Sequence, residues 1–102
     1  MVEHIVLFKW KPDTSREAIE AAVAGLMGLK YKIPGIIDMT CGDNFSSRSQ
    51  GYEFGLVIRF TDREALEAYG PNPLHQEVVQ TLIAPIREEV IAVDYNIDTL
   101  RG

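Results

Sequence analysis

The side chains in this sequence that are best suited to acid–base chemistry near neutral pH are its two histidines, His4 and His75. Histidine is the side chain that ordinarily changes charge between about pH 5 and pH 8, so it is the most frequent general acid or base. The single cysteine, Cys41, has no base beside it in the sequence, which disfavours a role as nucleophile. Zinc-site spacings, nucleotide-binding loops and a serine nucleophile elbow are absent from the sequence. Proton transfer is therefore the candidate chemistry.

His75 follows Asn72 and Pro73, a capping residue and a helix-opening proline, so it is predicted to lie in the first turn of a helix. The positive end of the helix dipole favours the neutral, basic form of an imidazole there, which suits a general base. The same position also allows the ring to pack or cap locally. Tyr69 could donate its phenolic proton to a developing enolate oxygen, or it could fill the space between a helix and the sheet.

His4 lies on the same face of a predicted strand as Val6, Phe8 and Trp10, so we expect it to project into an apolar layer beneath the helices. A buried histidine needs a hydrogen-bond partner. His4 could be a cavity wall residue that meets His75 or a ligand, or a core histidine bonded to the backbone. Both interpretations stay open from the sequence.

Local patterns predict the elements that position these residues. Apolar runs and alternation predict four strands, over residues 2–10, 36–42, 52–60 and 90–97. Thr14-Ser15-Arg16-Glu17 and Thr61-Asp62-Arg63-Glu64 each follow a strand and predict helix starts at Thr14 and Thr61. A further helix opens at Pro73 and should be kinked or interrupted at Pro85. The repeated signal indicates two βαβ halves, so the predicted fold is α+β and ferredoxin-like (βαββαβ), with helices on one face of a four-stranded antiparallel sheet.

Length and composition limit the classes of protein. With 102 residues, 46% of them hydrophobic, the chain forms one core, so a single domain is predicted over residues 1–102. The formal charge is -5 and the ten Lys and Arg residues are scattered, so a nucleic-acid partner is not expected. The sequence has no signal peptide and no long apolar run, so we expect a cytoplasmic protein without a membrane partner.

Both faces of the first strand are apolar, which predicts a second buried surface on the sheet. Ile5, Leu7 and Val57 would expose a contiguous apolar patch on the face without helices. A second copy laid sheet to sheet would cover this patch and give a barrel-like homodimer. The alternative is a monomer, in which the polar side chains of Lys9, Glu53, Arg59 and Asp94 allow that face to remain exposed to solvent.

Four short segments of the sequence carry a resemblance to a known family. They are Met1–Trp10, Ile33-Pro34-Gly35, Pro73-Leu74-His75 and Ile91–Tyr95. In this order they resemble the stress-responsive α/β-barrel (Dabb) family over about residues 2–97. The resemblance implies a homodimeric α+β barrel with a cavity between the sheet and the helices of each protomer. Few members of the family have a known activity.

One plant member is an olivetolic acid cyclase, which closes a linear polyketide by aldol condensation without a cofactor. The resemblance to it implies His75 as the base, with His4 and Tyr69 in the same site. Phe54 and Leu26 stand where that enzyme has a histidine and a tyrosine in its cavity. The polyketide substrate is therefore not implied for this chain.

Some plant members of the family also hold a magnesium ion through main-chain carbonyls just after the first helix. In this chain these carbonyls would belong to Lys30, Ile33 and Ile36. Carbonyl ligands leave no side-chain signature in a sequence. No other cofactor is implied.

Three functions remain open. The first is a dimer that binds a small apolar or aromatic molecule in a cavity near His75, lined by Trp10, Leu26 and Phe54, with enolisation or cyclisation as its reaction. The second is a non-catalytic stress-related or structural dimer. The third is a relative of the cofactor-free or haem-degrading monooxygenases that share the dimeric barrel plan.

Overall fold

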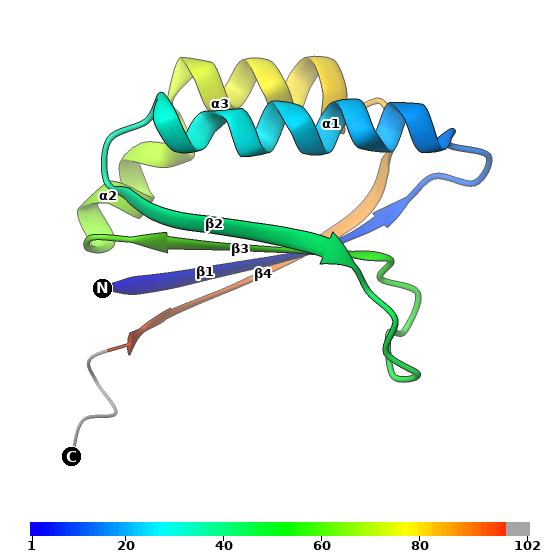
Figure 1. Cartoon of the computed structure of the whole chain (residues 1–102), viewed down its shortest axis with the longest axis horizontal. Helices are drawn as coiled ribbons and strands as arrows, with labels where there is room; N and C mark the ends of the chain where they lie inside the picture. The colour runs from blue at the N-terminus through cyan, green and yellow to red at the C-terminus, as the bar shows by residue number, and fades with distance from the viewer. Residues whose placement is uncertain (98–102) are drawn as a thin grey trace.

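The structure, a computed structural model of the chain, describes residues 1–97 (Figure 1). Four strands form one antiparallel sheet in the order β2-β3-β1-β4. Their bounds are β1 Val2–Trp10, β2 Ile36–Asp43, β3 Phe54–Phe60 and β4 Arg87–Asn96. The helical segments are α1 Arg16–Gly28, the 3-10 turn η1 Leu29–Tyr31, α2 Arg63–Tyr69, α3 Pro73–Val78 and the π-helical turn η2 Val79–Ile83. The predicted ferredoxin-like fold is confirmed.

Two strands begin at other residues than predicted, because main-chain hydrogen bonds rather than apolar side chains set their ends. β1 has its predicted bounds. β3 begins two residues later than expected because the Tyr52 amide donates to the Ser49 carbonyl within the preceding loop, at 3.0 Å. β4 begins at Arg87 rather than Val90, since pairing with β1 uses main-chain groups and does not require an apolar run. The predicted tail over residues 98–102 lies outside the described residues.

The two helix starts are each displaced by one residue. The N-cap of α1 is Ser15, whose hydroxyl accepts a hydrogen bond from the Ala18 amide at 3.1 Å, so Thr14 was the wrong choice. The Thr14 hydroxyl instead donates to the Lys11 carbonyl at 2.6 Å. The N-cap of α2 is likewise Asp62, not Thr61. The near repeat in the sequence is therefore a repeat of the same cap, one position later than expected.

One face of the sheet is covered by the helices, and the core lies between them (Figure 1). Alternate residues of the two central strands point into this layer and are buried, namely Val2, Val6, Phe8, Trp10, Phe54, Leu56, Ile58 and Phe60. Helix α1 contributes Ala22 and Leu26. The helix that opens at Pro73 ends in a π turn at Ile83, before Pro85, because proline lacks the amide proton that a further turn needs. Among residues 1–97, no helix is long and apolar enough to cross a membrane.

The other face of the sheet carries an apolar patch, here called the open face. Strand pairing places Ile5 beside Val57 and Val93, and Leu7 beside Ile91. Ile91, Val93 and Tyr95 are about half exposed. Two ion pairs flank the patch, Lys9 with Glu89 and Arg59 with Glu3, each at 2.9 Å.

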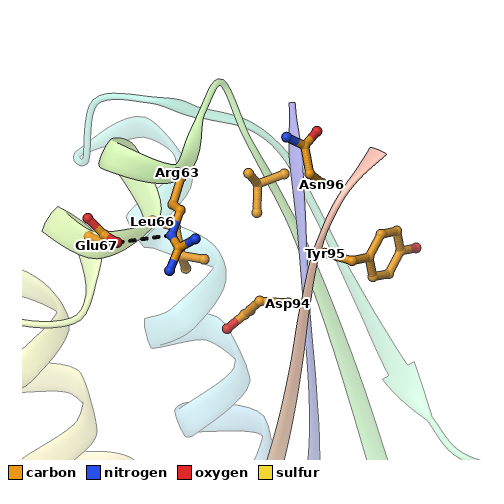
Figure 2. Close-up of a pocket in the computed structure, with 7 residues that line it drawn as sticks. Arg63, Leu66, Glu67, Asp94, Tyr95 and Asn96 are labelled. Carbon is orange, nitrogen blue, oxygen red and sulfur yellow. Dashed lines mark hydrogen bonds and ion pairs between the residues drawn. The ribbon is translucent and has the colours of Figure 1, made fainter. Parts of the chain in front are cut away.

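Asp94 was expected on the open face and lies on the opposite one. It pairs with His4 across the β1–β4 ladder, and directly opposed residues share a face of the sheet. Figure 2 shows the Asp94 side chain directed toward the helices, whereas Tyr95 points to the other side of β4. Of the four polar residues expected to solvate the open face in a monomer, Asp94 therefore lies on the covered face instead.

Candidate functional site

A pocket of about 250 Å³ lies between the covered face of the sheet and the segment α3–η2. His4, Tyr69, His75 and Leu26 all line it, so the structure brings together four of the residues that the sequence singled out. The remaining lining is mostly apolar and consists of Val6, Phe8, Leu56, Gln76, Val79, Ile83, Arg87, Val90 and Ala92. Among the described residues no carboxylate lines the pocket, and three of its side chains can carry positive charge: His4, His75 and Arg87.

His75 is held by the turn that precedes α3. Its Nδ1 lies 2.9 Å from the carbonyl oxygen of Gly70, which can only accept a hydrogen bond. Nδ1 must therefore carry the proton, and in the neutral ring Nε2 keeps its lone pair. The Gln76 amide donates to the same carbonyl at 2.7 Å. The Gly70 carbonyl thus fixes both the tautomer and the orientation of His75, as a general base requires.

His4 is held in the same way by a carboxylate. Its Nδ1 is hydrogen-bonded to Oδ1 of Asp94 on the neighbouring strand, so Nδ1 donates and Nε2 is again the free nitrogen. The His4 side chain is 15% exposed and that of Asp94 is 46% exposed. His4 is therefore a pocket residue with a side-chain partner, and of the two expected arrangements the backbone-bonded core histidine is not the one observed.

Tyr69 lies between the two histidines. Its ring centroid is 4.2 Å from that of His75 and 6.2 Å from that of His4, and the residue is 3% exposed. Burial raises the pKa of the Tyr69 phenol well above its ordinary value, so the hydroxyl stays protonated as a hydrogen-bond donor. Within residues 1–97 the Tyr69 hydroxyl makes no hydrogen bond of its own, although it is not sealed from solvent. The donor is available to a ligand.

The structure places the other two predicted pocket residues elsewhere. Trp10 is buried and stacks on Phe8, with ring centroids 5.1 Å apart, so it forms a layer behind the pocket wall. Phe54 packs against Trp10 and lines a separate hollow beside Cys41 and α1. Burial raises the pKa of the Cys41 thiol, which disfavours the thiolate and agrees with its expected inertness as a nucleophile.

Sequence reasoning missed Asp94, Gln76 and Arg87. Asp94 could have been found by asking which residue partners a buried His4, but the answer needs the register between residues 90 positions apart. Gln76 follows His75 directly, and nothing in the local sequence indicated that its side chain would bond to the Gly70 carbonyl. Arg87 was missed because β4 was expected to begin after it.

A larger hollow of about 380 Å³ lies beyond Asp94, between α2 and the end of β4 (Figure 2). Arg63, Leu66 and Glu67 line it from the helix, and Arg63 is paired with Glu67 at 3.1 Å. Within the part of the chain that the structure describes, no histidine or buried tyrosine reaches this hollow. The imidazole and phenol groups that distinguish the smaller pocket therefore set it apart as the candidate site.

The three carbonyls expected to hold magnesium belong to η1, the following turn and the start of β2. Lys30 is a residue of η1, and its ammonium group is 3.1 Å from Asp38 Oδ1. That carboxylate also accepts from the Met39 amide, so the local anionic oxygen is already engaged. Residues 1–97 contain no cluster of three or more His, Cys, Asp and Glu side chains arranged to bind a metal. Magnesium at the carbonyls of Lys30, Ile33 and Ile36 stays a prediction.

Comparison with known proteins gives the family. The family model for the stress responsive A/B barrel domain, Dabb, matches residues 2–97. A stress-response A/B barrel domain-containing protein of Arabidopsis thaliana is 30% identical over 102 residues, which are 100% of this chain and 39% of that protein. A second Arabidopsis protein of the same description is 30% identical over 99 residues, which are 93% of this chain and 46% of that protein. The chain thus spans less than half the length of these two relatives.

Solved structures show the same fold. A dimeric ferredoxin-like protein of unknown function from Jannaschia sp. CCS1 is 31% identical, with a TM-score of 0.80, over 94% of this chain and 98% of that one. A hydroxynitrile lyase from Passiflora edulis superposes with a TM-score of 0.86 over 99% of this chain and 96% of that one. Its identity is 19%, so that likeness concerns the fold alone. With its fold, its covered sheet face and a family match over almost its whole length, the chain belongs to the stress-responsive A/B barrel domain (Dabb) family.

Proposed function

We propose that this domain binds a small, largely apolar or aromatic carbonyl compound in the pocket at His75 and catalyses its enolisation or cyclisation. The observation that carries the proposal is the convergence of His4, Tyr69 and His75 on one apolar pocket, with Nδ1 of each histidine engaged and Nε2 left free. Convergent polar groups in an apolar pocket are the usual mark of a ligand site. A non-catalytic protein would be expected to fill this space with side chains, so the pocket favours binding.

The proposed reaction is a proton transfer that needs no cofactor. The Tyr69 hydroxyl donates a hydrogen bond to the carbonyl oxygen of the ligand, and Nε2 of His75 removes a proton from the adjacent carbon. The electron pair of the broken C–H bond moves to the oxygen and gives an enolate. Gly70 stabilises the imidazolium through the Nδ1 hydrogen bond. His4, backed by the negative charge of Asp94, lines the same pocket and supplies a second imidazole near the reacting group.

The test is exchange of the methyl protons of acetophenone for deuterium, followed by NMR. We expect the wild-type chain to accelerate the exchange and His75→Ala to lose about 100-fold or more of that acceleration. Tyr69→Phe, which keeps the ring and removes the donor, should lose activity and keep binding. Gln80→Ala, an exposed change on η2, is the control and should match the wild type. Equal exchange in His75→Ala and wild type would refute His75 as the base.

We also propose that the chain assembles as a homodimer through the open face. The patch around Ile5, Leu7 and Val93 is apolar and about half exposed at β4, and such surfaces on soluble proteins commonly mark interfaces. The similar Jannaschia protein is described as dimeric. Light scattering at micromolar concentration should give twice the chain mass of 11.4 kDa. A stable monomer would contradict the proposal.

A further inference from the structure

Among the described residues, Arg87 is the one permanently charged side chain in the lining of the pocket at His75. It is half-buried, and within residues 1–97 its guanidinium group makes no ion pair and no side-chain hydrogen bond. The nearby carboxylate of Glu89 is not the partner of Arg87, because Glu89 pairs with Lys9 at 2.9 Å on the open face. A partly buried charge without a partner is costly in a folded protein, so its position calls for an explanation.

A β-bulge in β4 turns Arg87 toward the pocket. Lys9 of β1 pairs with Glu89, but the next residue, Trp10, pairs with Arg87, so Glu88 is an extra residue on β4. An extra residue reverses the alternation of side chains beyond it. Arg87 therefore shares the covered face with buried Trp10 and points to the same side as Val90, rather than lying outside on the open face.

The other lining residues set the character of a ligand that would pair with Arg87. Between the two ends of the pocket the wall is apolar, formed by Val6, Phe8, Leu26, Leu56 and Ile83 among others. On β1 the lining runs from His4 to Phe8. Arg87 pairs with Trp10, beyond Phe8, and six residues of extended strand separate the Cα atoms of His4 and Trp10 by about 20 Å. The group that meets Arg87 is therefore remote from the group that meets the two histidines.

We propose that the pocket takes an elongated carboxylic acid, whose carboxylate pairs with Arg87 while its apolar body extends toward His4, Tyr69 and His75. This inference rests on the proposed function of the pocket and names the class of its ligand. The planar guanidinium matches a carboxylate with two parallel hydrogen bonds. A phosphate, with up to two negative charges, would leave charge unpaired beside a single cation in an apolar wall. An apolar cavity of about 150 Å³ holds benzene, so about 250 Å³ accommodates one ring with a short acid chain.

The test compares two probes of the same shape, 4-phenylbutyrate and 4-phenylbutanamide, by calorimetry and NMR. We expect the wild-type chain to bind the acid about tenfold more tightly than the amide, as a charge-assisted hydrogen-bond pair allows. Arg87→Met keeps an unbranched apolar stem and removes the guanidinium group with its charge, and it should bind both probes equally well. Arg48→Met removes the same charge from the exposed β2–β3 loop and should keep the preference for the acid.

The outcomes separate this inference from the function on which it rests. If both probes bind with equal affinity and shift the NMR signals of His4 and His75, the pocket is a ligand site and the role of Arg87 is refuted. A preference for the acid that survives in Arg87→Met refutes the role of Arg87 as well. If neither probe binds while acetophenone exchange still depends on His75, this inference is refuted and the proposed function stands; if that exchange is absent as well, both are refuted.

Discussion

His4 and Asp94, which are 90 positions apart in the sequence, are opposed across the β1–β4 ladder and joined by a hydrogen bond from Nδ1 to Oδ1. The pair connects the first strand to the last and stands between two hollows, because His4 lines the pocket at His75 and Asp94 lines the hollow beside α2. It therefore joins the closing strand of the fold to the candidate site. Its contribution can be measured separately from the chemistry.

Asp94→Ala should lower the free energy of unfolding by about 1 kcal/mol, because Nδ1 of a largely buried His4 loses its acceptor. The loss is modest because Asp94 is about half exposed. Urea unfolding measures it. In a His4→Phe background, which has no donor to satisfy, the same change should cost almost nothing. Equal costs in both backgrounds would show that the two side chains are not coupled.

Ser15→Ala and Asp62→Ala should each destabilise the protein by about 1 kcal/mol, since each removes the acceptor of an N-terminal helix amide. Thr61→Ala, one position before Asp62, serves as the matched control and should cost less than about 0.5 kcal/mol. Thermal or urea unfolding compares the three variants. A larger loss in Thr61→Ala than in Asp62→Ala would show that Thr61 is the N-cap of α2, as the sequence first indicated.

Gly35→Ala should destabilise the protein by more than about 1 kcal/mol, because the backbone and the space around this residue both disfavour a side chain. Gly35 has a φ of +88°, and an added Cβ would lie 2.6 Å from the Cβ of Ala65 in α2. Gly28→Ala, at the end of α1, meets nothing within 4 Å and replaces glycine in a helix, so it should be neutral or stabilising. The urea midpoint should fall in Gly35→Ala and stay at the wild-type value or rise in Gly28→Ala. Similar midpoints would argue against the tight approach of Gly35 to α2.

Tyr69 should make stability fall as pH rises above about 10. Burial raises its pKa in the folded state, whereas the unfolded chain releases the phenolic proton near about pH 10. Between about pH 10, where the phenol titrates in the unfolded chain, and the higher pKa of the folded state, the unfolded state binds fewer protons than the folded state, so rising pH favours unfolding. Urea midpoints from about pH 8 to about pH 11 should therefore fall less steeply in Tyr69→Phe than in the wild type. Tyr31→Phe, at an exposed residue, should keep the wild-type slope, and an unchanged slope in Tyr69→Phe would contradict the prediction.

Val93→Glu should convert the proposed dimer into a monomer, because it places a charge in the centre of the open face, where Val93 is 52% exposed. Gln80→Glu introduces the same charge on the exposed side of η2 and should leave the dimer intact. Light scattering distinguishes the two masses. A Val93→Glu chain that remains dimeric would place the interface on another surface.

The sequence predicted the element order and the inward-facing residues because both depend on short-range patterns. Alternation along residues 2–10 placed Val6, Phe8 and Trp10 on the covered face, and all three are buried in the structure. Phe54 and Trp10 were assigned to the correct face, but their place relative to the pocket depends on which helix lies above them. An aromatic residue on the covered face can belong to the core or to a cavity wall, and local pattern does not separate the two.

The candidate site shows the same division. His4, Tyr69 and His75 were identified from residue type, local position and the family resemblance, whereas their partners were fixed by contacts that no local pattern records. Asp94 meets His4 only because β1 and β4 are neighbours in a particular register, and Arg87 enters the pocket only because one residue bulges out of that register. Side-chain alternation along a strand is set by the backbone of that strand, so the sequence determined the faces. Register is set by the pairing of distant segments, so the tertiary structure alone decided which charged group meets which histidine, and which one is left for a ligand.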